Sequence, residues 1–211
     1  MKIRSLSLAA LVFSLGLAAS AYANAQTPDV YVQTQHNTLT GLLRQPTSPT
    51  QSAQISAALD SMIDYDALVK GTFGLPCPAQ LPNCANHWKD LSSDQQTEIS
   101  GRIKTLVQKQ YSKNLKRTLN YTITYAGSGN VGNFVSVHTE AQSNLDPREP
   151  KVFIDYVLEP ANGGSYRVVD IVTERSSLVK NWYTTFDRYL NDPTKGYPHL
   201  KQKVDDNIAK L

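Results

Sequence analysis

The sequence predicts a single α+β domain in which helices pack over a four-stranded antiparallel sheet. Segments with apolar residues at helical spacing come first, segments rich in β-branched and aromatic residues follow, and helical spacing returns at the end. Short breaks that contain glycine separate the middle segments, which is typical of antiparallel hairpins. The 211 residues suit one ordinary domain with a sizeable core, and no internal repeat divides them.

The first 25 residues have the pattern of a signal peptide. Two basic residues precede the apolar run Leu6 to Leu17, which is shorter than the roughly 20 residues that span a bilayer. Small residues then predict cleavage after Ala23 or Ala25, which leaves a mature domain of residues 26–211. An uncleaved membrane anchor is the alternative. Export would place the domain where disulfides form and ATP is lacking.

The charge of the mature chain is almost balanced. The formal net charge of +3 falls to +1 when Lys2 and Arg4 leave with the leader. No run of basic residues is dense enough to predict nucleic-acid binding. Lys113, Lys116 and Arg117 stand where a helix is expected to end, and cations there interact favourably with the helix dipole. A role in binding a phosphate or a lipid headgroup is the alternative for these three residues.

Cys77 and Cys84 bracket a proline-rich octet that excludes a helix. In an exported chain with two cysteines we expect one disulfide, worth about 2.5 kcal/mol in the chain-entropy model. A zinc site with His87 as a third ligand is the alternative, but the spacing matches no established zinc pattern. The spacing also excludes a redox pair of the Cys-x-x-Cys type.

Three helices are expected before the cysteines. The first covers Asp29 to Leu43 and ends at a proline-rich break. Thr50 can cap the second, and Asp64 can cap a short third one. The apolar positions of the second helix recur at helical spacing: Ile55, Leu59, Met62 and Ile63.

A long helix from Ser92 to Leu119 is the clearest element of the sequence. Ser92 and Gln95 have the form of a capping box. One apolar stripe runs along about seven turns, formed by Ile99, Ile103, Leu106, Val107, Tyr111, Leu115 and Leu119. We expect this stripe to lie on the sheet.

The strands and the last two helices follow. The expected strands are Tyr121–Tyr125, Phe134–Thr139, Lys151–Leu158 and Tyr166–Val172. The breaks between them include Gly127-Ser-Gly129 and Asn162-Gly-Gly164. Ser176 can cap a helix that carries Leu178, Val179, Trp182, Phe186 and Leu190. Leu200, Val204, Ile208 and Leu211 mark the last helix.

The order and spacing of several segments resemble the MlaC, or toluene-tolerance auxiliary, family. These segments are Asp64-Tyr-Asp-Ala-Leu-Val-Lys-Gly-Thr-Phe-Gly74, His87-Trp88, Gln95-Gln96, Tyr111 with Leu115, Ile154-Asp-Tyr156, Tyr166-Arg-Val-Val-Asp-Ile-Val172, and Glu174-Arg-Ser-Ser-Leu-Val-Lys-Asn181 with Phe186. Their arrangement behind a signal peptide makes the match fairly specific. The segment from Cys77 to Asn86 departs from the family, whose members usually run directly from Gly74 to Trp88.

The resemblance implies an NTF2-like cone in which helices and sheet enclose an apolar cavity. Acyl chains would lie inside and the headgroup near the opening. It implies a periplasmic phospholipid carrier of Gram-negative bacteria, which supports outer-membrane lipid asymmetry. The implied partners are an outer-membrane lipoprotein complex and an inner-membrane ABC transporter complex with an MCE-type subunit. No cofactor, metal or nucleic acid, and no enzymatic activity, belongs to this expectation.

The candidate cavity residues are apolar positions on elements that are expected to face one another. They are Leu68, Leu106, Tyr111, Ile154, Tyr156, Val169, Ile171, Val179, Trp182 and Phe186. For each of them, ordinary core packing is an equally good interpretation.

Two other functions stay open. One is an NTF2-like small-molecule enzyme, because Asp155 and Asp170 lie in the middle of expected strands, where a buried carboxylate can transfer protons. Structural pairing is the simpler interpretation of both acids. The other is a non-catalytic periplasmic adaptor with a filled core. No GxSxG, HExxH or glycine-rich phosphate loop favours a particular enzyme.

Overall fold

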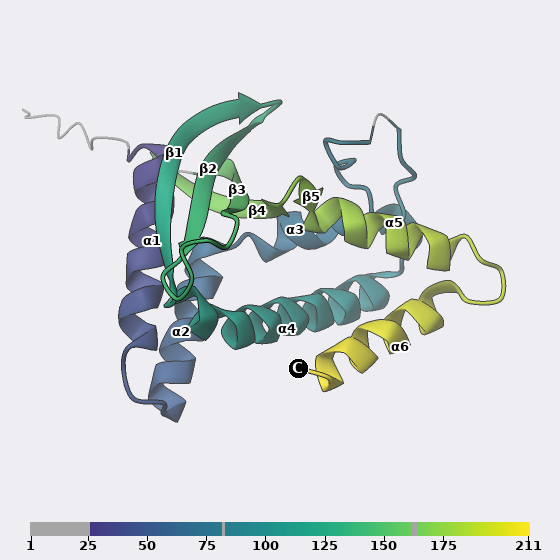
Figure 1. Cartoon of the computed structure of the whole chain (residues 1–211). Coiled ribbons are helices and arrows are strands. Elements are labelled where there is room, and N and C mark those ends of the chain that lie inside the picture. The colour runs from purple at the N-terminus through teal and green to yellow at the C-terminus, as the bar shows by residue number, and fades with distance from the viewer. Residues whose placement is uncertain (1–25, 82, 162–163) are drawn as a thin grey trace, which may run out of the picture.

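The computed structural model describes residues 26–81, 83–161 and 164–211, without the side chains of residues 113–115. The expected leader, residues 1–25, and Asn162 and Gly163 of the expected glycine-containing break lie outside this range. The helices are α1 (Pro28–Leu43), α2 (Pro49–Met62), α3 (Tyr65–Thr72), η1 (Trp88–Asp90), α4 (Ser93–Thr118), α5 (Leu178–Leu190) and α6 (Gly196–Ala209). The strands are β1 (Tyr121–Val131), β2 (Phe134–Ser143), β3 (Val152–Ala161), β4 (Ser165–Thr173) and β5 (Ser176–Ser177). The architecture is therefore the expected α+β fold (Figure 1).

Side-chain caps fix where most of the helices begin. The predicted capping box of Ser92 and Gln95 starts α4, and the Asp64 carboxylate accepts a hydrogen bond from the Ala67 amide at the start of α3. Two predicted caps were wrong. Ser48 rather than Thr50 caps α2, because Pro49 takes the first helical position. Ser177 rather than Ser176 caps α5.

No helix within the described residues is long and apolar enough to cross a membrane.

The sheet has the strand order β1-β2-β3-β4-β5, and all neighbours are antiparallel. The four expected strands are present, and the two-residue strand β5 adds a fifth. The expected break at Gly127-Ser-Gly129 was wrong, because β1 continues through these residues to Val131 and stays paired with β2. Side chains alternate between the two faces of a strand. In β3, Tyr156 and Leu158 are buried on the inner face, whereas Phe153 is 51% exposed on the outer face. The inner face is the one that the helices cover.

A β-bulge interrupts the alternation in β4. Val157 pairs with Asp170 and Leu158 pairs with Val168, so Val169 is the extra residue. The bulge shifts the phase of the strand. Val168 and Ile171 therefore lie on the inner side. Val169, which was predicted to lie there with Ile171, does not.

Helix α4 stands away from the sheet. Its backbone packs against α2, α3 and α6 more closely than against any strand. Figure 1 shows α4 running alongside α6, below the sheet, while α1 lies beside β1 and β2. The expectation that the α4 stripe lies on the sheet was therefore only partly right, because other helices cover much of it and space remains between α4 and the strands.

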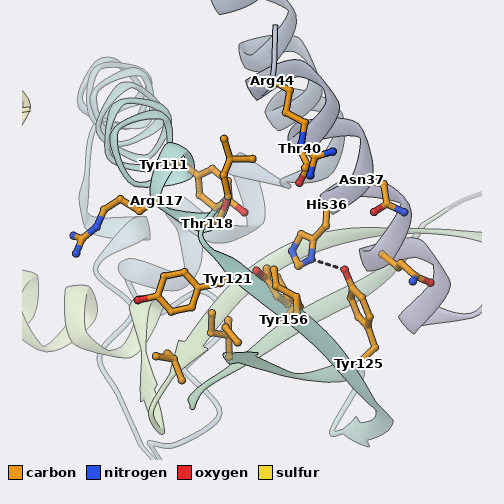
Figure 2. Close-up of a pocket in the computed structure, with 16 residues that line it drawn as sticks. His36, Asn37, Thr40, Arg44, Tyr111, Arg117, Thr118, Tyr121, Tyr125 and Tyr156 are labelled. Carbon is orange, nitrogen blue, oxygen red and sulfur yellow. Dashed lines mark hydrogen bonds between the residues drawn. The ribbon is translucent and has the colours of Figure 1, made fainter. Parts of the chain in front are cut away.

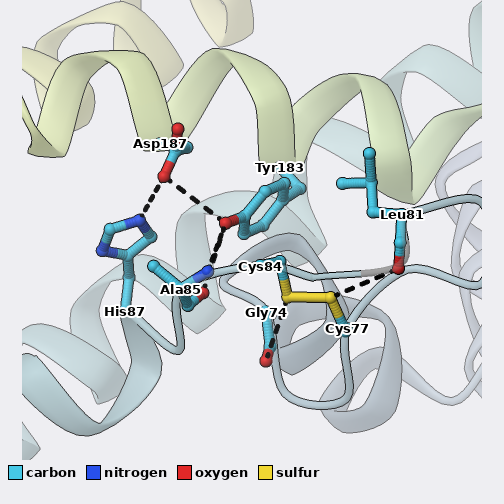
Figure 3. Close-up of a disulfide and its surroundings, with 8 residues drawn as sticks. All are labelled: Gly74, Cys77, Leu81, Cys84, Ala85, His87, Tyr183 and Asp187. Carbon is cyan, nitrogen blue, oxygen red and sulfur yellow. Dashed lines mark hydrogen bonds and ion pairs between the residues drawn. A yellow bond between two sulfur atoms is a disulfide. The ribbon is translucent and has the colours of Figure 1, made fainter.

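The segment between α3 and α4 contains the predicted Cys77–Cys84 disulfide. Side chains of α5 hold its second half in place (Figure 3). The Tyr183 hydroxyl accepts a hydrogen bond of 2.8 Å from the Ala85 amide, and the Asp187 carboxylate lies 2.7 Å from Nε2 of His87. His87 is thus part of a structural contact with Asp187, and a disulfide takes the place of the zinc alternative.

The two mid-strand acids have structural partners. Asp170 accepts hydrogen bonds from the amides of Ile171 (2.8 Å) and Val179 (3.0 Å) and from the Ser177 hydroxyl (2.6 Å). It thereby ties β4 to the start of α5. Burial raises the pKa of Asp170, and these hydrogen bonds oppose the shift. Asp155 lies on the outer face, 2.8 Å from Nδ1 of His138.

We expect Asp170→Ala to lower the free energy of unfolding by about 1–3 kcal/mol, because it leaves several buried donors without a partner. Asp155→Ala is the matched control. It removes an exposed pair and is expected to cost less than about 1 kcal/mol. Denaturant unfolding of both variants tests this comparison. Equal losses in the two variants would contradict the role of Asp170 in holding α5.

Candidate functional site

Two adjacent cavities lie between the helices and the inner face of the sheet. The first, which we call the α1 chamber, has a volume of about 350 Å³. The second, the α5 chamber, has a volume of about 380 Å³. Both volumes lie in the range of ligand pockets, which is about 300–1,000 Å³. Tyr111, Thr118, Ile154 and Tyr156 line both chambers, so the two spaces share a wall.

The chambers are built from different elements. The other residues of the α1 chamber come from α1, the end of α4 and the first three strands: Gln33, His36, Asn37, Thr40, Arg44, Arg117, Leu119, Tyr121, Ile123, Tyr125, Ala141 and Val152. The other residues of the α5 chamber come from α3, α4, β4, the start of α5 and the residues next to them: Ile63, Leu68, Val107, Gln110, Val168, Ile171, Thr173, Ser176, Leu178 and Asn181.

A pair of tyrosines forms part of the shared wall. The Tyr111 hydroxyl from α4 and the Tyr156 hydroxyl from β3 lie close enough to shift each other's pKa. Burial is the main cause that raises the pKa of both hydroxyls, so both stay protonated near neutral pH. The shared wall therefore carries two neutral hydroxyl groups in a largely apolar space.

A second polar pair lies in the α1 chamber (Figure 2). Nδ1 of His36 is 2.7 Å from the Tyr125 hydroxyl, and the His36 ring meets the Tyr156 ring edge-on at 5.0 Å. His36 is 8% exposed. Burial lowers the pKa of His36 to about 4, so the ring is neutral at pH 7. The pair joins α1 to β1 without adding a charge.

The charges of the two chambers differ. No charged side chain lines the α5 chamber among the residues described. The α1 chamber has Arg44 and Arg117 in its lining and no described Asp or Glu. Both arginines are exposed, so this end of the α1 chamber is open to solvent. The cavities therefore combine apolar walls with one positively charged, hydrated end.

Half of the ten predicted cavity residues line the chambers. Leu68 and Ile171 line the α5 chamber, and Tyr111, Ile154 and Tyr156 line both chambers. These five residues come from α3, α4, β3 and β4.

The other five lie elsewhere. Val169 and Val179 line a separate groove, which α3, residues 75–80 and the outer side of the sheet form. Leu106, Trp182 and Phe186 line none of these spaces. The Phe186 ring lies 6.2 Å from Trp182 and 5.3 Å from Phe73, within the core cluster.

The sequence interpretation missed the contribution of α1 and β1. His36, Arg44, Tyr121 and Tyr125 line the α1 chamber, and none was a cavity candidate. Tyr121, Ile123 and Tyr125 alternate with threonine, and this period of two was a usable signal for one common face. The polar residues of α1 gave no such signal, because they resemble an ordinary solvent-facing side.

The described residues contain no group of three or more His, Cys, Asp or Glu that could hold a metal ion. Neither Asp155 nor Asp170 lines a chamber.

Comparison with known proteins agrees with the fold. The family model described as MlaC protein matches residues 82–205, more than half of the chain. Among solved structures, the chain is similar to the phospholipid-binding protein from Ralstonia solanacearum in complex with a phospholipid. The TM-score is 0.68 at 18% sequence identity, and the match covers 89% of this chain and 98% of that one. No curated protein matches the sequence.

The buried histidine predicts a pH-dependent stability. The pKa of His36 is about 4 in the fold and about 6.5 in an unfolded chain, so the unfolded chain takes up the proton first as the pH falls. We expect the free energy of unfolding to drop by about 3 kcal/mol through this group between pH 6.5 and pH 4. His36→Gln should remove that part of the dependence. Denaturant unfolding across this range measures it, and an unchanged pH profile in the variant would refute the assignment.

Proposed function

This chain belongs to the MlaC protein family, and we propose that it is a periplasmic carrier that binds a phospholipid and moves it between membranes. The observation that carries this proposal is the pair of chambers that share a wall beneath the helices. Their apolar lining suits acyl chains, and the hydrated end of the α1 chamber suits a polar headgroup. The phospholipid complex of the structural neighbour supports the same kind of ligand.

The apolar walls provide the binding energy. Burying acyl chains stabilises a complex by about 0.8 kcal/mol per methylene, so a two-chain lipid needs no dedicated catalytic or metal group to be held. Two chambers with a shared wall give each chain of such a lipid a separate space. The polar pairs that line these spaces are neutral, so they impose little penalty on a neighbouring chain.

The carrier works by passing its lipid to partners. The expected donors and acceptors are an outer-membrane lipoprotein complex and an inner-membrane ABC transporter complex with an MCE-type subunit. Moving an acyl chain from one apolar site to another changes the free energy little, so the partners and not the carrier set the direction. Outer-membrane lipid asymmetry is the process that such transport would serve.

The proposed carrier unit is the exported domain of residues 26–211, released from its leader after Ala23 or Ala25. Residues 1–25 have the sequence pattern of a signal peptide. Membership of a family of periplasmic proteins and the disulfide in a two-cysteine chain support export.

A bulky side chain in the chamber should expel the lipid. Ile171 lines the α5 chamber, whereas its neighbour Val172 lies on the outer side of the sheet. We expect Ile171→Trp to reduce the co-purified lipid per protein several-fold, and the matched control Val172→Trp to retain it. Lipid extraction with mass spectrometry measures the occupancy.

The stability of the delipidated Ile171→Trp variant distinguishes a cavity from a filled core. Because the added ring enters empty space, the delipidated Ile171→Trp protein should unfold at nearly the wild-type denaturant concentration. In a filled core the same change would cost about 1–3 kcal/mol. Two results together would favour the adaptor with a filled core: purified wild-type protein that contains no lipid, and an Ile171→Trp variant that is strongly destabilised.

A further inference from the structure

Two arginines of the α1 chamber have no partner for their charge among the described residues. Arg44 stands at the end of α1, and Arg117 lies in the last turn of α4. Neither side chain forms an ion pair or a hydrogen bond with any residue described in the structure. Both line the same chamber, which has no described acidic side chain. The chamber thus has an uncompensated positive charge at its hydrated end.

Several other cations of the fold are paired. Arg102 contacts Glu98 and Asp205, Lys104 contacts Asp60, and Arg167 donates to the carbonyl groups of Asp60 and Ile63. Arg44 and Arg117 lie at the C-terminal ends of their helices, where the helix dipole favours a cation, and this explains part of their placement. It does not explain why two cations from different helices line one cavity. Lys116 is also in the last turn of α4, yet it donates to the Thr47 hydroxyl and lines neither chamber.

We propose that Arg44 and Arg117 form an anion site that binds the lipid phosphate and thereby sets the orientation of the lipid. This inference rests on the proposed lipid-carrier function. The phosphate lies at the ends of α1 and α4, and the acyl chains run past Tyr111 and Tyr156 toward the uncharged α5 chamber. A guanidinium group suits this role because its planar donors can hold two phosphate oxygens at once.

The arrangement in Figure 2 fits a site that closes around its ligand. Arg44 lies next to Thr40, whereas Arg117 extends away from it on the far side of Tyr111 and Thr118. The two side chains therefore frame the end of the chamber instead of forming one fixed clamp. Thr40 and Tyr121 add neutral hydroxyl groups to the same lining. Because both arginines are exposed, they can turn toward a phosphate, and salt should weaken the contact.

The site predicts a preference among lipids with the same acyl chains. A phosphatidylglycerol has a net negative charge at the phosphate, and a diacylglycerol has no phosphate. A phosphatidylcholine adds a cation, for which no described acidic side chain of the chamber offers a partner. The affinity should therefore fall in the order phosphatidylglycerol, phosphatidylcholine, diacylglycerol.

The test compares Arg44→Gln/Arg117→Gln with Lys89→Gln/Lys109→Gln, a control with the same change of charge at two exposed lysines outside both chambers. Each delipidated protein is titrated with the three lipids by displacement of a fluorescent fatty acid. The arginine variant should bind phosphatidylglycerol about tenfold more weakly, from the loss of charge-assisted hydrogen bonds, and diacylglycerol as the wild type does. The control should bind all three lipids within about twofold of the wild type.

The outcomes separate this inference from the carrier function. The phosphate site is overturned if the arginine variant binds phosphatidylglycerol as tightly as the wild type does. It is also overturned if the variant loses as much affinity for diacylglycerol as for phosphatidylglycerol. Lipid binding itself stands in both cases. A wild type that binds none of the lipids overturns the carrier function itself. Titration with inorganic phosphate alone forms the last arm. Tight binding of free phosphate that leaves phosphatidylglycerol affinity unchanged would overturn the assignment to a lipid headgroup.

Discussion

The distance between α4 and the sheet is the constraint from which the candidate site follows. The inner face of the sheet is apolar and must be covered, and α1, α2, α3 and α5 each contact strands of the sheet. Helix α4 packs mainly on other helices, so long side chains rather than backbone contact bridge the remaining space. The Tyr111–Tyr156 contact is such a bridge. Both side chains belong to the wall that the two chambers share.

The sequence was sufficient for most of the fold because local chemistry decides it. The capping box at Ser92 and Gln95, the cap at Asp64 and the four runs of β-branched residues each specify an element without help from distant contacts. The caps of α2 and α5 were misplaced by one or two residues, since serine and threonine neighbours compete for the same role. Which elements face one another depends on tertiary packing, which no local pattern contains.

The same limit explains why only half of the predicted cavity residues line the chambers. Val168 and Val169 are chemically identical, so the bulge that turns Val168 to the chamber and Val169 to the outer groove leaves no mark in the sequence. Val179 and Phe186 lie on one apolar side of α5, but that side meets α3 and the core rather than the chambers. Helix α1 was overlooked because the candidates were chosen as apolar positions, whereas the residues that α1 adds to the hydrated end of the chamber are polar.

The disulfide segment is attached to α5 and lies apart from the lipid chambers. Tyr183 and Asp187 attach it to α5, on the side of the molecule away from the α1 chamber (Figure 1). No residue between Cys77 and Asn86 that the structure describes lines either chamber. The departure from the family pattern at this corner can therefore vary without altering the lipid space. The α1 chamber, in turn, has a buried polar pair of its own, because Nδ1 of His36 lies 2.7 Å from the Tyr125 hydroxyl. A carrier has to stay folded without its ligand, and a buried imidazole that already has a hydroxyl partner avoids the desolvation cost that would destabilise the unloaded form.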